Sequence, residues 1–217
     1  MLDEQVVARR LDDLRRRIVA AGGVGVRIVG VTKTLGPESW RIAKQLGIDA
    51  VGENYAQELA AKAAEVGHED RPPVHFIGHL QTNKVRLIAD SVDVWESVDR
   101  VSLIAEIAKR QASRQPMALI QVNTTGEAGK NGCTPGEASA LVEAARREGI
   151  RVMGLMTVGP TDQDPVRTRT AFALLRRMAD DLGVDERSMG MSADLEIAVE
   201  EGATIVRVGS ALFGQRS

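Results

Sequence analysis

The stretch VRIVGVT occupies residues 26–32 and is followed at once by Lys33. It is rich in valine and isoleucine and too short for a buried helix, so it predicts a β-strand. Similar apolar runs recur at residues 50–52, 74–77, 92–95, 117–122, 152–156 and 205–208, with a weak further strand at 187–189. Amphipathic segments separate these runs. This alternation is typical of a parallel sheet whose strands are connected by helices.

The segments between the strands carry helix signals. Residues 135–148 follow Thr134 as a cap, open with Pro135 and end at Gly149. Asp99 is the expected cap of a helix over 99–113, and Glu58 and Lys62 form a predicted helical pair within 56–66. The remaining predicted helices cover 2–21, 37–46, 165–182 and 193–201.

Eight strand–helix units in about 200 residues fit a compact (β/α)₈ barrel. We expect a single α/β domain over residues 1–217, with an extra N-terminal helix within 1–24 and the barrel over 25–214. A doubly wound open sheet is the alternative, because the loss of one strand would turn the first architecture into the second.

Composition excludes several classes of function. The chain has 28 Lys plus Arg against 30 Asp plus Glu, so a nucleic-acid partner or an anionic membrane is not expected. Aromatic residues make up 3%, too few for a base-stacking platform. Cys133 is the only cysteine and is expected to be a buried, inert thiol. The first 20 residues are charged throughout and no run reaches the ~20 apolar residues of a membrane helix, so we expect a cytoplasmic protein.

Polar residues close nearly every predicted strand, where the active sites of parallel barrels lie. They are Lys33, Asn54, His79, Ser97, Asn123, Met156 with Thr157, Ser192, and Arg207 with Gly209 and Ser210. The most informative is Lys33, because a lysine enclosed by a barrel mouth can lose its proton and attack a carbonyl. The alternative is a solvated lysine at a strand end.

The segment from Ser188 to Gly214 has the features of a phosphate site. Ser192 precedes a predicted helix, and Gly209 and Ser210 follow the last strand, where barrels often bind phosphate. Ser192 could equally be a plain helix cap and Gly209 a tight turn. Alternation places Arg207 on the same strand face as Ile205, where a buried guanidinium needs a partner such as Glu53.

Other familiar sites are not predicted. The sequence contains no dinucleotide fingerprint, phosphate-binding P-loop, serine-hydrolase elbow or zinc-protease motif. Three histidines and one cysteine make a poor metal set, so no metal is expected. His75 is expected to be a satisfied core histidine.

Eight segments together resemble the pyridoxal phosphate homeostasis proteins. They are VGVTK (29–33), GENYAQE (52–58), HFIGHLQTNK (75–84), QVNT (121–124), GCTP (132–135), MGLMT (153–157), SMGMSADLEIAV (188–199) and VRVGSALFG (206–214). The resemblance covers nearly the whole chain. Val74 replaces a common tryptophan and Ser210 a common threonine, which puts only local packing in doubt.

The resemblance implies a barrel like the N-terminal domain of alanine racemase that binds pyridoxal 5′-phosphate (PLP). Lys33 would form a Schiff base with it, and Arg207 would face the pyridine nitrogen. Phosphate would be held by Ser192, Gly209, Ser210 and the backbone near Met191. Asn54 would lie near the ring. His79, Asn123 and Met156 would complete the pocket.

The same resemblance implies a cytoplasmic protein, often monomeric, that acts in PLP homeostasis. Its partners would be PLP and, in one reading, PLP-dependent apo-enzymes. An arginine beside the pyridine nitrogen weakens the electron sink that PLP catalysis needs, and we expect no second base. We therefore expect no amino-acid catalysis. The alternatives are a small PLP-dependent racemase or decarboxylase, and a Schiff-base aldolase.

Overall fold

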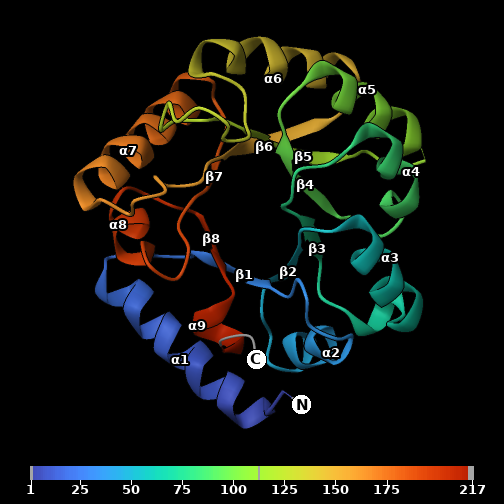
Figure 1. The fold of residues 1–217 in the computed structure, drawn as a ribbon, viewed down its shortest axis with the longest axis vertical. Helices are drawn as coiled ribbons and strands as arrows, with labels where there is room; N and C mark the ends of the chain where they lie inside the picture. Colours follow the sequence, from blue (N-terminus) through green and yellow to red (C-terminus); the bar gives the residue numbers. More distant parts are fainter. Residues whose placement is uncertain (1, 112, 215–217) are drawn as a thin grey trace.

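The chain forms a closed barrel of eight parallel strands, in which each strand pairs with its neighbours in sequence order and β1 pairs with β8 (Figure 1). The computed structural model describes residues 2–111 and 113–214. The strands are β1 (Arg27–Val31), β2 (Ala50–Glu53), β3 (Val74–Phe76), β4 (Val94–Val98), β5 (Met117–Gln121), β6 (Arg151–Met156), β7 (Glu186–Ser188) and β8 (Ile205–Val208).

Helices surround the barrel in a ring, and α1 lies outside it beside α8 and α9 (Figure 1). The α-helices are α1 (Glu4–Ala20), α2 (Glu38–Gln45), α3 (Ala56–Glu65), α4 (Val85–Ile88), α5 (Val101–Arg110), α6 (Ala138–Arg147), α7 (Pro165–Asp181), α8 (Leu195–Glu200) and α9 (Ser210–Phe213). Short 3₁₀ turns are η1 (His68–Asp70), η2 (Thr82–Lys84) and η3 (Pro135–Glu137).

The predicted (β/α)₈ barrel is confirmed, and the open sheet is excluded because the first and last strands pair. Their register brings Val29 opposite Arg207 and Gly30 opposite Val208. The weak strand predicted at 187–189 is β7, which is short and carries charged residues. Thr134 caps its helical turn as predicted, and Glu137 completes a capping box with it.

Some boundaries differ from the prediction. Strand β4 covers Val94–Val98 instead of 92–95, so Ser97 lies inside the strand. Helix α5 begins after Arg100, and the Asp99 carboxylate instead pairs with the Arg100 guanidinium at 2.6 Å. The short helices α4 and α9 were not predicted, because a single turn carries too little periodicity to be recognised.

The core has two layers. The inner layer fills the barrel with Val29, Ala50, Val94, Leu119, Met156 and Ile205. The outer layer packs the strands against the helices and includes large side chains such as Trp40, Phe76 and Phe172. Since side chains alternate along a strand, Val31 and Lys33 continue the inward face of Val29, which directs Lys33 into the barrel mouth.

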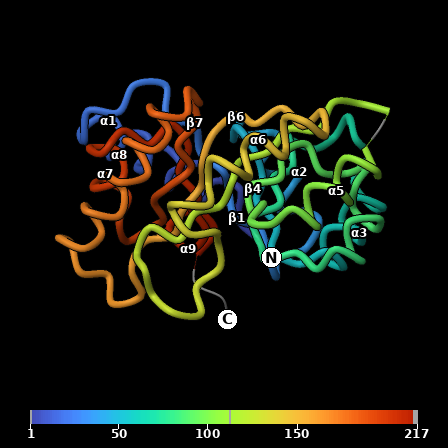
Figure 2. The backbone as a smooth tube through the Cα atoms, turned by 90° about the horizontal axis from the view of Figure 1, so that it is seen from above, coloured from blue at the N-terminus to red at the C-terminus, as the bar shows by residue number. Residues whose placement is uncertain are grey.

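The loop after β5, residues 122–134, extends far from the barrel at the carboxyl ends of the strands (the yellow-green loop in Figure 2). It is tied to the loop after β6 by Glu127, whose carboxylate accepts a hydrogen bond from the Thr161 hydroxyl at 2.8 Å. In the described part of the chain, no helix is long and apolar enough to cross a membrane.

Candidate functional site

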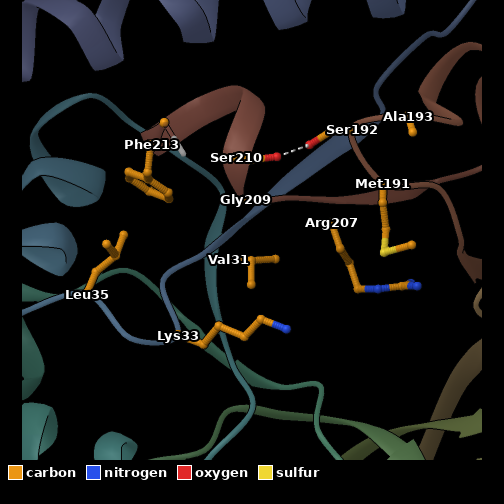
Figure 3. Close-up of a pocket in the computed structure, with 11 residues that line it drawn as sticks. Val31, Lys33, Leu35, Met191, Ser192, Ala193, Arg207, Gly209, Ser210 and Phe213 are labelled. Atoms are coloured by element: carbon orange, nitrogen blue, oxygen red, sulfur yellow. Dashed lines mark hydrogen bonds between the residues drawn. The ribbon is translucent and has the colours of Figure 1, made fainter. Parts of the chain in front are cut away.

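A cavity of about 530 Å³ lies at the carboxyl ends of β1 and β8. Its volume falls within the ~300–1,000 Å³ range of small-molecule sites. The lining residues are Val31, Lys33, Leu35, Met191, Ser192, Ala193, Arg207, Gly209, Ser210, Phe213 and Gly214 (Figure 3). Six of the predicted site residues therefore share one cavity: Lys33, Met191, Ser192, Arg207, Gly209 and Ser210.

Lys33 follows β1 and is half-buried. In Figure 3 its amine lies below Val31 and points to the side on which Arg207 lies, while the Arg207 guanidinium extends away from Lys33. A primary amine at this place can attack an aldehyde or ketone that enters the cavity.

The hydroxyls of Ser192 and Ser210 meet on the other side of Val31 in the same view (Figure 3). Ser210 Oγ lies 3.5 Å from Ser192 Oγ, which also accepts from the backbone N–H of Ala211 at 3.4 Å. Ser192 does not cap α8, because the residue at that position is Asp194. Two hydroxyls and a backbone N–H at one place offer a polar cradle for an anion.

Asp194 anchors this cradle. Its carboxylate accepts a hydrogen bond from the Met191 backbone N–H at 2.5 Å. Burial raises the pKa of Asp194, an effect that this hydrogen bond and the charge of Arg207 oppose. The bond fixes the turn that carries Met191 and Ser192 into the cavity.

Arg207 is 4% exposed and has one hydrogen-bond partner in β7 and another directly after β6. Its Nη1 donates to Ser188 Oγ at 2.7 Å, and its Nη2 donates to the Thr157 carbonyl at 2.7 Å. The nearest acid is Glu96, at 3.9 Å. The prediction that Glu53 is the partner of Arg207 is wrong, because Glu53 lies on the outward face of β2 and pairs with Lys62.

Glu96 joins the polar groups inside the barrel. It accepts from His75 Nδ1 and from Ser188 Oγ, each at 2.5 Å. Complete burial acts to raise the pKa of Glu96. The hydrogen bond and charge of His75, together with Arg207 and Ser188, outweigh it and hold that pKa below its usual value. His75 is thus a satisfied core histidine, as predicted.

The other four predicted site residues do not line this cavity. Met156 is buried in the inner core layer, and His79 lies half-exposed beyond β3. Asn123 lines a second cavity of about 230 Å³ and bonds to its own loop. Asn54 follows β2, and its Oδ1 is buried without a hydrogen-bond partner among the described residues. An orphaned buried acceptor of this kind fits a site that is completed by a ligand.

Two further expectations concern metal binding and the thiol. Among the residues that the structure describes, no group of three or more His, Cys, Asp or Glu side chains could hold a metal ion. Cys133 is buried, and burial, with smaller contributions from Glu137 and Asp99, raises its pKa to about 12. The predicted inert thiol is consistent with this environment.

The sequence analysis named Thr157 as a strand-end residue but missed Glu96, Ser188 and Asp194 as members of the site. The first of these left a signal: Glu96 stands two residues after Val94 in an apolar run, so alternation places both on the inward face. A charged residue there requires a partner inside the barrel.

These groups together fit a phosphorylated aldehyde. An amine lies at one side of the cavity, a hydroxyl and N–H cradle at the other, and a buried guanidinium between strands beside them. The amine suits the carbonyl, the cradle suits the phosphate, and the guanidinium suits a ring nitrogen that remains unprotonated.

Comparisons with known proteins agree with this geometry. A family model described as "Alanine racemase, N-terminal domain" matches residues 2–217. The pyridoxal phosphate homeostasis protein of Pseudomonas aeruginosa is 40% identical, over 97% of this chain and 94% of that protein. The human protein of the same name is 35% identical, over 98% of this chain and 82% of that protein.

Solved structures of other proteins have a similar fold. PipY of Synechococcus elongatus, solved with PLP bound, aligns with a TM-score of 0.84 at 31% identity, over 96% of this chain and 100% of that one. An alanine racemase of Clostridium difficile aligns with a TM-score of 0.75 at 16% identity, over 95% of this chain and 57% of that one. The second match shows a shared fold.

Proposed function

This chain belongs to the alanine racemase N-terminal domain family and, within it, to the pyridoxal phosphate homeostasis proteins. On that premise we propose that it holds PLP as a Schiff base on Lys33 and acts in cytoplasmic PLP homeostasis without turning over amino acids. The observation that carries the proposal is the single cavity shared by Lys33, Arg207, Ser192 and Ser210. The relative with PLP in its structure supports the choice of ligand.

Each group has a distinct task in this proposal. Lys33 Nζ bonds to the aldehyde carbon, and the aldehyde oxygen leaves as water. Ser192, Ser210 and the backbone around Gly209 bind the phosphate, in the cradle where the two hydroxyls meet. Arg207 donates toward the pyridine nitrogen and keeps it unprotonated, since a guanidinium cannot accept a proton.

Bound PLP supplies an electrophilic carbonyl and an electron-withdrawing ring. The ring withdraws electrons best when its nitrogen is protonated, and Arg207 disfavours that state. Among the described residues that line the cavity, Lys33 is the only amine, and there is no carboxylate, histidine or tyrosine. Tyr55, the only tyrosine, is 51% exposed and lies beyond β2. Proton transfer to both faces of a substrate therefore lacks a second residue, which favours storage over racemisation.

A reversible bond also allows release. Water returns the aldehyde and the free amine, so PLP held on Lys33 can pass to PLP-dependent apo-enzymes. We propose such enzymes as the recipients.

Borohydride trapping tests the ligand and the residue together. The purified protein is mixed with PLP and reduced, and its peptides are analysed by mass spectrometry. We expect one pyridoxyl group per chain, on Lys33. Label spread over several lysines, or no label, would contradict the proposal.

Variants separate the roles. Lys33→Ala should remove the imine absorbance while its thermal unfolding stays close to that of the wild type. Lys44→Ala changes an exposed lysine of α2 and should bind PLP as the wild type does. Amino acids added to the loaded protein should racemise or lose carbon dioxide no faster than with free PLP. A faster rate would favour the racemase or decarboxylase.

A further inference from the structure

Helix α3 holds the backbone on both sides of Lys33. Glu58 Oε2 accepts a hydrogen bond from the Thr34 backbone N–H at 2.7 Å. Lys62 Nζ donates to the Thr32 carbonyl at 2.6 Å. These two side chains were predicted to pair with each other along the helix, but each instead contacts a neighbour of Lys33.

The Lys62 contact is rigid because it is buried. Lys62 also pairs with Glu53 at 2.6 Å, and the two side chains are 5% and 0% exposed. The same Glu53 oxygen accepts from the Thr32 hydroxyl at 2.7 Å and from Trp40 Nε1 at 3.0 Å. The residue before Lys33 is therefore fixed through its carbonyl and its hydroxyl.

The residue after Lys33 is held in a strained conformation. Thr34 has a φ of 66°, in the left-handed region that β-branched residues rarely adopt. This turn reverses the chain directly after Lys33, and it persists because its surroundings impose it. The Glu58 carboxylate is the group that accepts the exposed N–H of this strained residue.

We propose that Glu58 is a positioning residue for Lys33. By holding Thr34 in the left-handed turn, it directs the Lys33 amine into the cavity, while Lys62 fixes the preceding residue. The inference rests on the proposed function, since it assigns Glu58 a part in the capture of PLP by Lys33. Glu58 itself does not line the cavity.

The test is a rescue experiment. Glu58→Ala removes the acceptor, and we expect about tenfold weaker PLP binding, the effect of losing one good cap-like hydrogen bond. Glycine adopts a positive φ without a Cβ penalty, so Thr34→Gly in the Glu58→Ala background should recover at least about threefold of the loss. Imine absorbance at a series of PLP concentrations measures both effects.

A second ligand and a control variant distinguish a loss of Lys33 positioning from a general loss of folded structure. Pyridoxal has the aldehyde without the phosphate. Its binding to Glu58→Ala should fall by the same factor as that of PLP, because Glu58 positions the amine that bonds to the aldehyde. Inorganic phosphate should compete equally well with PLP in the wild type and in Glu58→Ala. Glu65→Ala removes a half-exposed acid from the same helix, one paired with Arg41, and should bind PLP as the wild type does.

Hydrogen exchange gives a readout without PLP: the Thr34 amide should exchange faster in Glu58→Ala. Unchanged PLP binding in Glu58→Ala, an equal loss in Glu65→Ala, or no rescue by Thr34→Gly would overturn the positioning role while the proposed function stands. A wild-type protein that forms no imine would overturn both.

Discussion

Arg207 donates a hydrogen bond to the Ser188 hydroxyl at 2.7 Å, and Ser188 in turn donates to Glu96 at 2.5 Å. The cavity arginine on β8 is thereby fixed through β7 to an acid on β4, across the barrel interior. Because the Ser188 hydroxyl donates to a carboxylate, its oxygen lone pairs remain for the guanidinium. The orientation of Arg207 thus depends on a charge that lies outside the cavity.

Loss of that charge should be costly. Glu96→Gln leaves Arg207 without its buried counter-charge, and we expect it to lower the free energy of unfolding by about 3 kcal/mol. The pKa of Glu96 is lowered in the folded state, so its contribution is present above the unfolded carboxyl pKa of about 4.3 and is lost as the pH falls further. Urea unfolding of the variant and the wild type at pH 7 and at pH 4 measures the difference between their free energies of unfolding. We expect this difference to be smaller at pH 4. Equal stability of variant and wild type at pH 7 would refute this account.

The two hydroxyls of the cradle should act on the phosphate alone. Ser192→Ala and Ser210→Ala should each weaken PLP binding about tenfold, because each removes a hydrogen bond to a charged group. Pyridoxal, which lacks the phosphate, should bind both variants as it binds the wild type. Fluorescence or absorbance titration with the two ligands checks this. A comparable loss with pyridoxal would show that the serines act elsewhere.

The link between the loops after β5 and β6 should be acid-resistant. The hydrogen bond from Thr161, followed by that from Lys130, lowers the pKa of Glu127 to about 2. The stabilisation that Glu127 provides is therefore complete above about pH 4.3, the unfolded value, and is lost as the pH falls toward about 2. The carboxyl resonance of Glu127 in an NMR titration measures its pKa directly.

Thr161→Val removes the main cause and should move the midpoint up toward the ordinary value. Thr170→Val provides the control, because the Thr170 hydroxyl donates to the Val166 carbonyl on α7. A midpoint that Thr161→Val leaves in place would contradict the assigned cause.

The single thiol should be unreactive in the folded protein. With a pKa of about 12, Cys133 carries almost no thiolate at pH 8. We expect iodoacetamide to alkylate it only after unfolding in urea, which mass spectrometry of the intact chain detects. Rapid alkylation of the native protein would show that the buried environment opens.

The sequence predicted the barrel because most of its strands are apolar and regularly spaced. It misplaced β4, since Glu96 and Ser97 resemble the polar end of a strand when read alone. In the structure, Glu96 pairs with His75 inside the barrel, and the Ser97 hydroxyl donates to the Gly78 carbonyl. Short strand β7 was weakly marked for a related reason, because ERS carries two charged residues.

The residues that line the cavity were predicted more completely than the hydrogen bonds inside the barrel that hold Arg207. Lys33, Ser192 and Ser210 follow strands or precede helices, positions that topology brings to one end of a barrel. The Glu96–Ser188 link joins residues 92 positions apart, and its partners depend on strand register. Similarly, no spacing rule relates Glu58 to the backbone of Thr34. Such contacts appear only once the strands are placed.

The pairing of β1 with β8 sets the time at which the site can first exist. Lys33 follows the first strand, Arg207 lies in the last strand, and Gly209 and Ser210 follow that strand, so the cavity lies where the barrel closes. During synthesis, a nascent chain that has not yet reached Arg207 carries the Lys33 amine but neither the guanidinium nor the complete cradle. Capture of the ligand in the complete site must therefore follow translation through Ser210, and ligand that binds then favours the closed barrel over any form in which the last strand has detached.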